Sequence, residues 1–186
     1  MRLLPFVLAL TIAAPGTWTR QHQEKSRSLT YTGTATLLGK ETPVTLRFYC
    51  NPERTADGTG VIGYELEVAN PDALKPFDFD DFEGPDAPAH ARKLLQASVL
   101  RGGKSVHSVR ESPSGFYVRN VFVFEVSKVF DEPGSSAKKT LRALTQDAGA
   151  FRITITDYRK ADLKLEVTVP IKGKRGDFAW LVAELK

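Results

Sequence analysis

Three segments, residues 29–37 (LTYTGTATL), 44–50 (VTLRFYC) and 61–69 (VIGYELEVA), decide the fold. In each of them apolar side chains alternate with polar or small ones, which is typical of a strand with one buried face. Turn-forming residues separate the segments, so we expect an antiparallel meander. The residues expected to face inward are Leu29, Tyr31, Gly33, Ala35, Leu37, Val44, Leu46, Phe48, Cys50, Ile62, Tyr64, Leu66 and Val68.

Further strand signals continue along the C-terminal half of the chain. Short strands are expected at residues 97–100 and 105–109, and alternating strands at residues 151–155 and 163–171. Residues 116–130 carry the longest β signal, with apolar side chains on both alternating faces. This pattern predicts one long strand that is either central and covered on both sides or bent between two sheets.

Helical patterns are few and short. Ser135 or Ser136 can cap a helix whose buried face repeats at helical spacing. A second short helix is expected at residues 87–95 and a third after Asp177. Together these elements predict a mostly β fold, an antiparallel β-sandwich or curved sheet of about eight strands with two or three short peripheral helices. The buried face of the first helix comprises Ala137, Leu141, Leu144 and Ala148.

The N-terminus has the layout of a secretory signal peptide. Arg2 precedes an apolar run of about 12 residues, too short to span a bilayer, and small residues follow it. We expect residues 1–16 to be the signal peptide, residues 17–28 a flexible lead-in and residues 29–186 a single mostly β domain. An uncleaved N-terminal anchor is the alternative. The expected location is therefore secreted or periplasmic, with no membrane span after removal of the signal.

Composition narrows the classes of partner. The 186 residues include 26 Lys and Arg and 22 Asp and Glu, and the interspersed charges leave a formal net charge of only +4. Nucleic-acid-binding proteins concentrate positive charge on one face, so no nucleic-acid partner is expected. Cys50 is the single cysteine, which excludes an intramolecular disulfide. Its place in an alternating strand indicates a buried thiol rather than a catalytic one.

Residues 77–86 (FDFDDFEGPD) have the most unusual local composition, with three phenylalanines and five acidic side chains. Carboxylates suit Ca²⁺, but the spacing does not match an EF-hand loop, so no metal site is predicted. A recognition surface for a sugar or a basic peptide is the second interpretation. The third is structural, with the rings packed inward and the acids keeping an edge hydrated. The candidate ligand-binding residues are Phe77, Asp78, Asp80, Asp81, Phe82, Glu83 and Asp86.

Catalytic and cofactor motifs are missing from the sequence. There is no Gly-X-Ser-X-Gly elbow, no phosphate-binding glycine loop and no histidine pair with metal-ligand spacing. Nothing selects one carboxylate pair for glycoside hydrolysis. We therefore expect no cofactor, and the catalytic residues, if there are any, remain unknown.

The C-terminal order of elements over residues 141–185 is helix, strand, connection, strand, glycine and a short amphipathic helix. It resembles the end of the invasion-associated locus B group of secreted bacterial β-sandwich proteins. The several cysteines of that group are missing here, and no function is taken from the resemblance.

The function expected from the sequence is that of a non-enzymatic binding or interaction module for an unidentified protein or carbohydrate ligand. Two alternatives remain open. One is a secreted hydrolase that acts on carbohydrate with acids of residues 77–86. The other is a calcium-stabilised adhesion-type module.

Overall fold

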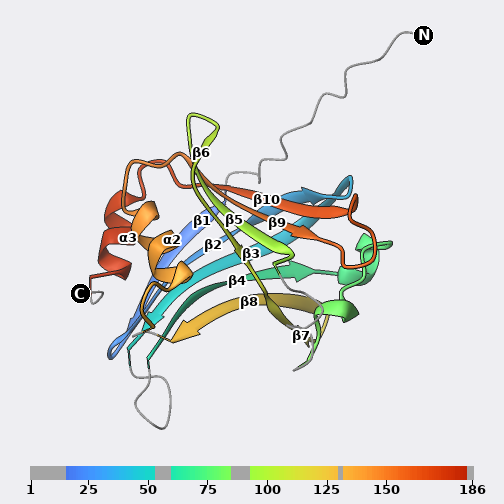
Figure 1. The fold of residues 1–186 in the computed structure, drawn as a ribbon, viewed down its shortest axis with the longest axis horizontal. Coiled ribbons are helices and arrows are strands. Elements are labelled where there is room, and N and C mark those ends of the chain that lie inside the picture. Colours follow the sequence, from blue (N-terminus) through green and yellow to red (C-terminus); the bar gives the residue numbers. More distant parts are fainter. Residues whose placement is uncertain (1–15, 53–59, 85–92, 130–131, 184–186) are drawn as a thin grey trace.

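Two antiparallel sheets build the protein (Figure 1). The computed structural model describes residues 16–52, 60–84, 93–129 and 132–183. The larger sheet has the order β1 (Thr17–Gln23), β2 (Ser26–Leu37), β3 (Lys40–Asn51), β4 (Val61–Ala69), β8 (Val121–Val129) and β7 (Ser114–Val118). The smaller has the order β10 (Lys164–Pro170), β9 (Ala150–Thr156), β5 (Leu95–Arg101) and β6 (Lys104–Glu111). The predicted mostly β, sandwich-like fold is confirmed.

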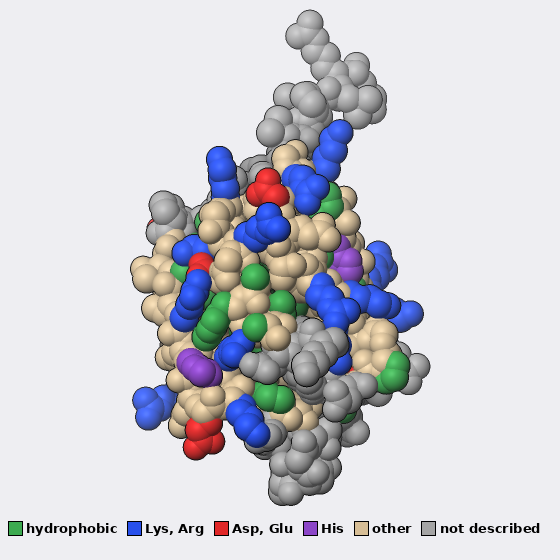
Figure 2. Space-filling model, turned by 90° about the vertical axis from the view of Figure 1, so that its left-hand side faces the viewer, with side chains coloured by type: hydrophobic (Ala, Val, Ile, Leu, Met, Phe, Trp, Pro, Cys, Tyr) green, Lys and Arg blue, Asp and Glu red, His purple; other side chains and the backbone are tan. Residues whose placement is uncertain are grey.

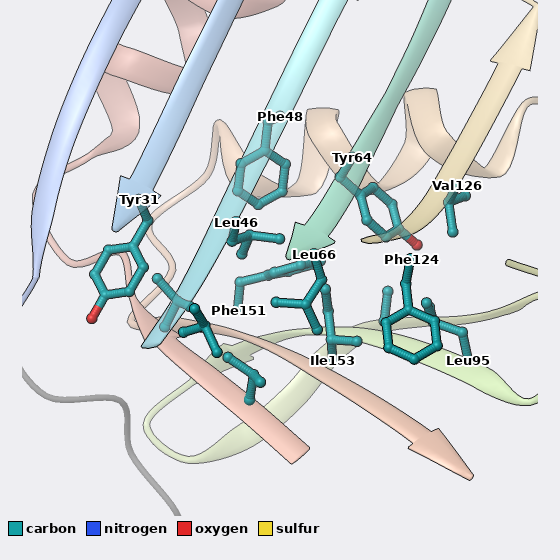
Figure 3. Close-up of a cluster of buried hydrophobic side chains, with 14 of the residues drawn as sticks. Tyr31, Leu46, Phe48, Tyr64, Leu66, Leu95, Phe124, Val126, Phe151 and Ile153 are labelled. Carbon is teal, nitrogen blue, oxygen red and sulfur yellow. The ribbon is translucent and has the colours of Figure 1, made fainter. Parts of the chain in front are cut away.

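The core lies between the inward faces of the two sheets, as Figure 3 shows. Phe48 of β3 and Tyr64 of β4 both meet Phe151 of β9, with ring centroids 5.1 and 5.7 Å apart respectively. All of the inward residues predicted for the first three strands are buried except Gly33, which is half-buried beneath the Tyr31 ring. The period of two therefore identified the buried face correctly.

The prediction of a flexible lead-in at residues 17–28 was wrong. Residues 17–23 form edge strand β1, which pairs with β2 in antiparallel register. Trp18 joins this strand to the core, since it packs against Tyr31, Phe48 and Phe178. The other side chains of β1 are exposed, so the segment shows no alternation of apolar residues that sequence patterning could detect.

The prediction of one long strand over residues 116–130 was also wrong. The segment folds into a hairpin of β7 and β8, which pair from Val118 with Val121 onwards. Arg119 adopts a left-handed backbone conformation, with φ of 56°, at the two-residue turn. This sequence, Arg-Asn, lacks the glycine that usually marks such a turn. The described residues thus form ten strands, because β1 and the division into β7 and β8 add two to the predicted eight.

Two α-helices lie together at one end of the sandwich, on the left in Figure 1. α2 (Ser136–Leu144) buries the predicted face. α3 (Arg175–Leu181) begins two residues before Asp177, the predicted cap, so Asp177 lies inside the first turn. Its carboxylate pairs with Arg20 and Lys174. Most of the helix predicted at residues 87–95 lies outside the described residues, and Leu95 itself begins β5.

Two short 3₁₀ helices, η1 (Pro71–Leu74) and η2 (Asp80–Phe82), follow β4. They lie at the opposite end of the molecule from α2 and α3, beside the connection between β9 and β10 (Figure 1). None of the helices in the described part of the chain has the length and apolar character of a membrane span.

Candidate functional site

The three phenylalanines of residues 77–86 are buried in the core. Phe82 stacks on Phe77 with centroids 5.7 Å apart and meets Phe124 of β8 edge to face at 5.2 Å. Phe79 packs between Phe122 and Phe124. The inward packing proposed in the structural interpretation of this stretch is therefore observed, and the rings anchor η2 to the larger sheet. The sheet edge proposed with it was wrong, because residues 80–82 form a 3₁₀ helix and not a strand.

The acidic side chains around these rings are held by groups of the protein itself. Arg159 lies 2.8 Å from Asp81 and 3.7 Å from Asp78, measured from guanidinium nitrogen to carboxylate oxygen. The Tyr117 hydroxyl donates a 2.8 Å hydrogen bond to Asp80. The pKa of Tyr117 is raised above its usual value, mainly by partial burial and secondly by the hydrogen bond to Asp80. Glu83 is exposed, and Asp86 lies outside the described residues.

Asp157, at the end of β9, completes the link between the acidic stretch and the smaller sheet. Its buried carboxylate accepts hydrogen bonds from the backbone N–H groups of Asp78, Arg159 and Lys160, at 3.0, 2.9 and 2.8 Å. Because Asp157 and Arg159 both belong to the β9–β10 connection, residues 77–82 fix the position of that connection.

Ala161 of the same connection lines a polar cavity. The cavity has a volume of about 260 Å³ and lies on the outer face of the smaller sheet. Its lining comprises Lys93, Leu94, Gln96, Arg110, Thr154, Thr156, Ala161 and Lys164.

Strand register brings the polar lining residues together. Gln96 of β5 pairs with Arg110 of β6 on one side and with Thr154 of β9 on the other, so the three lie in one row across the sheet. In the neighbouring row Lys164 of β10 pairs with Thr156. Residues in these positions alternate with the buried inward residues, and their side chains consequently point out of the sheet.

Lys93 enters the cavity from the segment that leads into β5. Its backbone is left-handed, with φ of 57°, and its N–H donates to the Ser112 hydroxyl at 3.1 Å. Such a conformation is uncommon for a residue with a side chain, and at this position it turns the chain into the strand.

Among the described residues, no acid balances the positive charge of the cavity. Its described lining contains no Asp or Glu, and within the described ranges Lys93, Arg110 and Lys164 form no salt bridge. The carboxylate closest along β10, Glu166, is engaged by Arg152 at 3.5 Å. Three unpaired cations on one concave surface produce a positive potential that favours an anion.

Within the described part of the chain, a second cavity and the face that carries α2 and α3 lack such a group of unpaired charges. A second cavity, lined by Leu100, Pro170 and neighbouring small residues, is mostly apolar, and its single hydroxyl, of Thr168, already accepts from Arg152. Figure 2 shows many Lys and Arg side chains on the face that carries α2 and α3, but they are spread over it. Two of the cations at this end, Arg20 and Lys174, share Asp177. Among the described residues no group of three or more His, Cys, Asp or Glu could hold a metal ion.

The cavity residues were not identified as a site from the sequence. They come from four strands and their flanking segments, and those on the strands are, taken singly, ordinary outward-facing residues of an alternating pattern. The only available signal was Lys164 in the outward series of β10. Comparison with protein-family models, with curated proteins and with solved structures finds no match to this chain.

Proposed function

We propose that the protein is a secreted or periplasmic, non-enzymatic binding module that holds a small anionic ligand in the polar cavity of the smaller sheet. The observation that carries the proposal is the convergence of Lys93, Arg110 and Lys164 on one cavity without an acidic partner among the described residues. Arginine binds oxyanions through paired N–H groups and lysine through a mobile point charge, so the set suits a carboxylate, sulfate or phosphate.

The arrangement of the acidic stretch favours binding over hydrolysis. A glycoside hydrolase needs two carboxylates that face the substrate, whereas Asp78 and Asp81 both face Arg159. Arg159 and the Tyr117 hydroxyl already contact the carboxylates of Asp78, Asp81 and Asp80. A calcium ion bound by these carboxylates would have to displace them. In this proposal residues 77–82 act on the ligand only indirectly, by positioning the cavity wall.

Export from the cytoplasm is part of the proposal and rests on the N-terminal pattern of the sequence. Mass spectrometry of protein collected from the periplasm or medium should find a mature N-terminus between Ala14 and Thr17. Recovery of chains that begin at Met1 from the same fraction would contradict signal cleavage.

Titration with inorganic phosphate, followed by amide NMR spectra at constant ionic strength, tests the site directly. Amide shifts should concentrate on the cavity ends of β5, β6, β9 and β10. The change Lys164→Glu should weaken binding at least about tenfold, because it reverses one of three charges around the anion. Lys104→Glu is the matched control, since Lys104 is an exposed lysine of the same sheet outside the lining. Equal loss in both variants, or shifts elsewhere, would overturn the proposal.

A further inference from the structure

We infer that the ligand of this cavity is a phosphate monoester of a polyhydroxyl compound, the chemistry shared by a sugar phosphate and by a phosphorylated inositol headgroup. This inference rests on the proposed anion site and adds the chemical class of the ligand. It follows from three features of the lining: its charge, its neutral polar atoms and its volume.

The charge of the lining favours a dianion over a monoanion. Lys93, Arg110 and Lys164 supply three positive charges, and no carboxylate among the described lining residues offsets them. A phosphate monoester carries a charge of about −1.5 to −2 at neutral pH and presents three acceptor oxygens. A carboxylate or a sulfate ester carries a single charge and would leave more of the positive potential unbalanced.

The neutral polar atoms favour a ligand that also has hydroxyl groups. Gln96 donates from Nε2 to the Ser108 hydroxyl at 2.9 Å, which holds its amide and leaves one N–H and the carbonyl oxygen for a ligand. The Thr154 hydroxyl donates to Glu166 at 3.5 Å, so its lone pairs are also available. Acceptor oxygens repel a bare phosphate group. They are useful only if the ligand brings O–H donors beside its phosphate.

The volume leaves space for more than the phosphate group. About 260 Å³ is roughly nine times the 30 Å³ that one water molecule takes in the liquid. It is also slightly below the usual range for drug-sized ligands, which begins near 300 Å³. Leu94 and Ala161 add an apolar wall against which the C–H groups of one sugar ring can pack.

Calorimetric titration with four probes at pH 7.5 and constant ionic strength tests this class. The probes are a hexose 6-phosphate, the same hexose 6-sulfate, the unmodified hexose and inorganic phosphate. We expect the hexose phosphate to bind about tenfold more tightly than the hexose sulfate and than inorganic phosphate, and the unmodified hexose not to bind measurably. Equal affinities for the sulfate and phosphate esters would overturn the dianion assignment while leaving the proposed anion site intact. Failure of all the anions to bind would overturn both.

Protonation of the ligand supplies a second, independent readout. The second pKa of a phosphate monoester is near 6, so only about one eleventh of the ligand is dianionic at pH 5. The monoanionic phosphate ester should bind about as weakly as the sulfate ester, so binding of the hexose phosphate should weaken about fivefold between pH 7.5 and pH 5, and binding of the sulfate ester should not change. Among the described residues the lining contains neither His nor a carboxylate, and the adjacent Glu166 is paired with Arg152. An unchanged affinity of the phosphate ester at pH 5 would contradict the inference.

Two variants separate the hydroxyl contacts from the charge contacts. Gln96→Ala should reduce the preference for hexose phosphate over inorganic phosphate about threefold or more. Ser105→Ala is the control, since Ser105 is an exposed residue of the same sheet that lies outside the lining. A preference that is unchanged in Gln96→Ala would overturn the polyol assignment. Co-sedimentation with phosphatidylcholine vesicles that contain phosphorylated inositol lipid would identify a lipid headgroup as the source of the ligand. Binding of the soluble ester alone would identify a free sugar phosphate. Both outcomes support a phosphate monoester of a polyhydroxyl compound.

Discussion

Replacement of Phe82 by alanine tests whether residues 77–82 anchor one end of the sandwich. Phe82 is fully buried, stacks on Phe77 at 5.7 Å and meets Phe124 at 5.2 Å. Truncation of a buried phenylalanine to alanine costs about 3–5 kcal/mol, because burial is lost and a cavity remains. The total stability of a domain is commonly about 5–15 kcal/mol, so the loss is a large fraction of it. For a chain of this length the midpoint of thermal unfolding should fall by roughly 6–20 °C.

Urea unfolding monitored by tryptophan fluorescence measures this loss, because Trp18 packs against core aromatics. Phe116→Ala is the matched control: it removes the same ring from β7, where the side chain is 41% exposed. We expect that variant to lose no more than about 1 kcal/mol. Phe82→Leu should recover part of the stability lost in Phe82→Ala. A loss below about 1 kcal/mol for Phe82→Ala, or an equal loss for Phe116→Ala, would refute the anchoring role.

Three further predictions concern the link to the smaller sheet, the thiol and the tyrosines. Asp157→Ala should destabilise the protein by about 1.5–3 kcal/mol in urea titrations and weaken anion binding, because three backbone N–H groups lose a charged acceptor. Asp162 is an exposed acid of the same connection, and Asp162→Ala should have neither effect. Cys50 is 1% exposed and should react with thiol reagents only after denaturation, so rapid labelling of native protein would contradict its burial. Burial raises several tyrosine pKa values above 10, so the folded state keeps these phenolic protons longer than the unfolded chain, and stability should be intact below about pH 10 and fall above it. Tyrosinate absorbance should rise at higher pH in native than in urea-unfolded protein, and coincident titrations would disprove this for Tyr31, Tyr49, Tyr64 and Tyr117.

Periodicity predicted the parts of the fold that depend on one buried face. The strands with inward Leu46, Phe48 and Tyr64, and the helix with inward Leu141, follow from spacing alone, because each buries a continuous apolar side. It failed for β1, where Trp18 is the one side chain of the strand that is not exposed. It failed again at the turn between β7 and β8, where Arg119 takes a conformation that its residue type does not indicate.

The acidic stretch was predictable as a place of interest but not in its contacts. Its inward phenylalanines were among the interpretations that composition allowed, since aromatic rings next to acids must either pack or remain exposed. Its partners, Asp157 and Arg159, lie about 80 positions further along the chain, at sequence separations of 79 and 78 residues in the observed hydrogen bonds. No local sequence pattern predicts a contact between residues that far apart in the chain.

By itself, the sequence determined the mostly β class, the inward residues of most strands, the absence of an intramolecular disulfide and the signal-like N-terminus, because each depends on composition or short-range spacing. Tertiary structure alone decided the order of the strands in the two sheets and therefore the cavity. Lys93, Arg110 and Lys164 become neighbours only when β6 and β9 pair with opposite edges of β5 and β10 pairs with β9. The physical reason is that side-chain alternation determines the face of the sheet on which a residue lies. Backbone pairing between distant segments determines which residues are neighbours on that face.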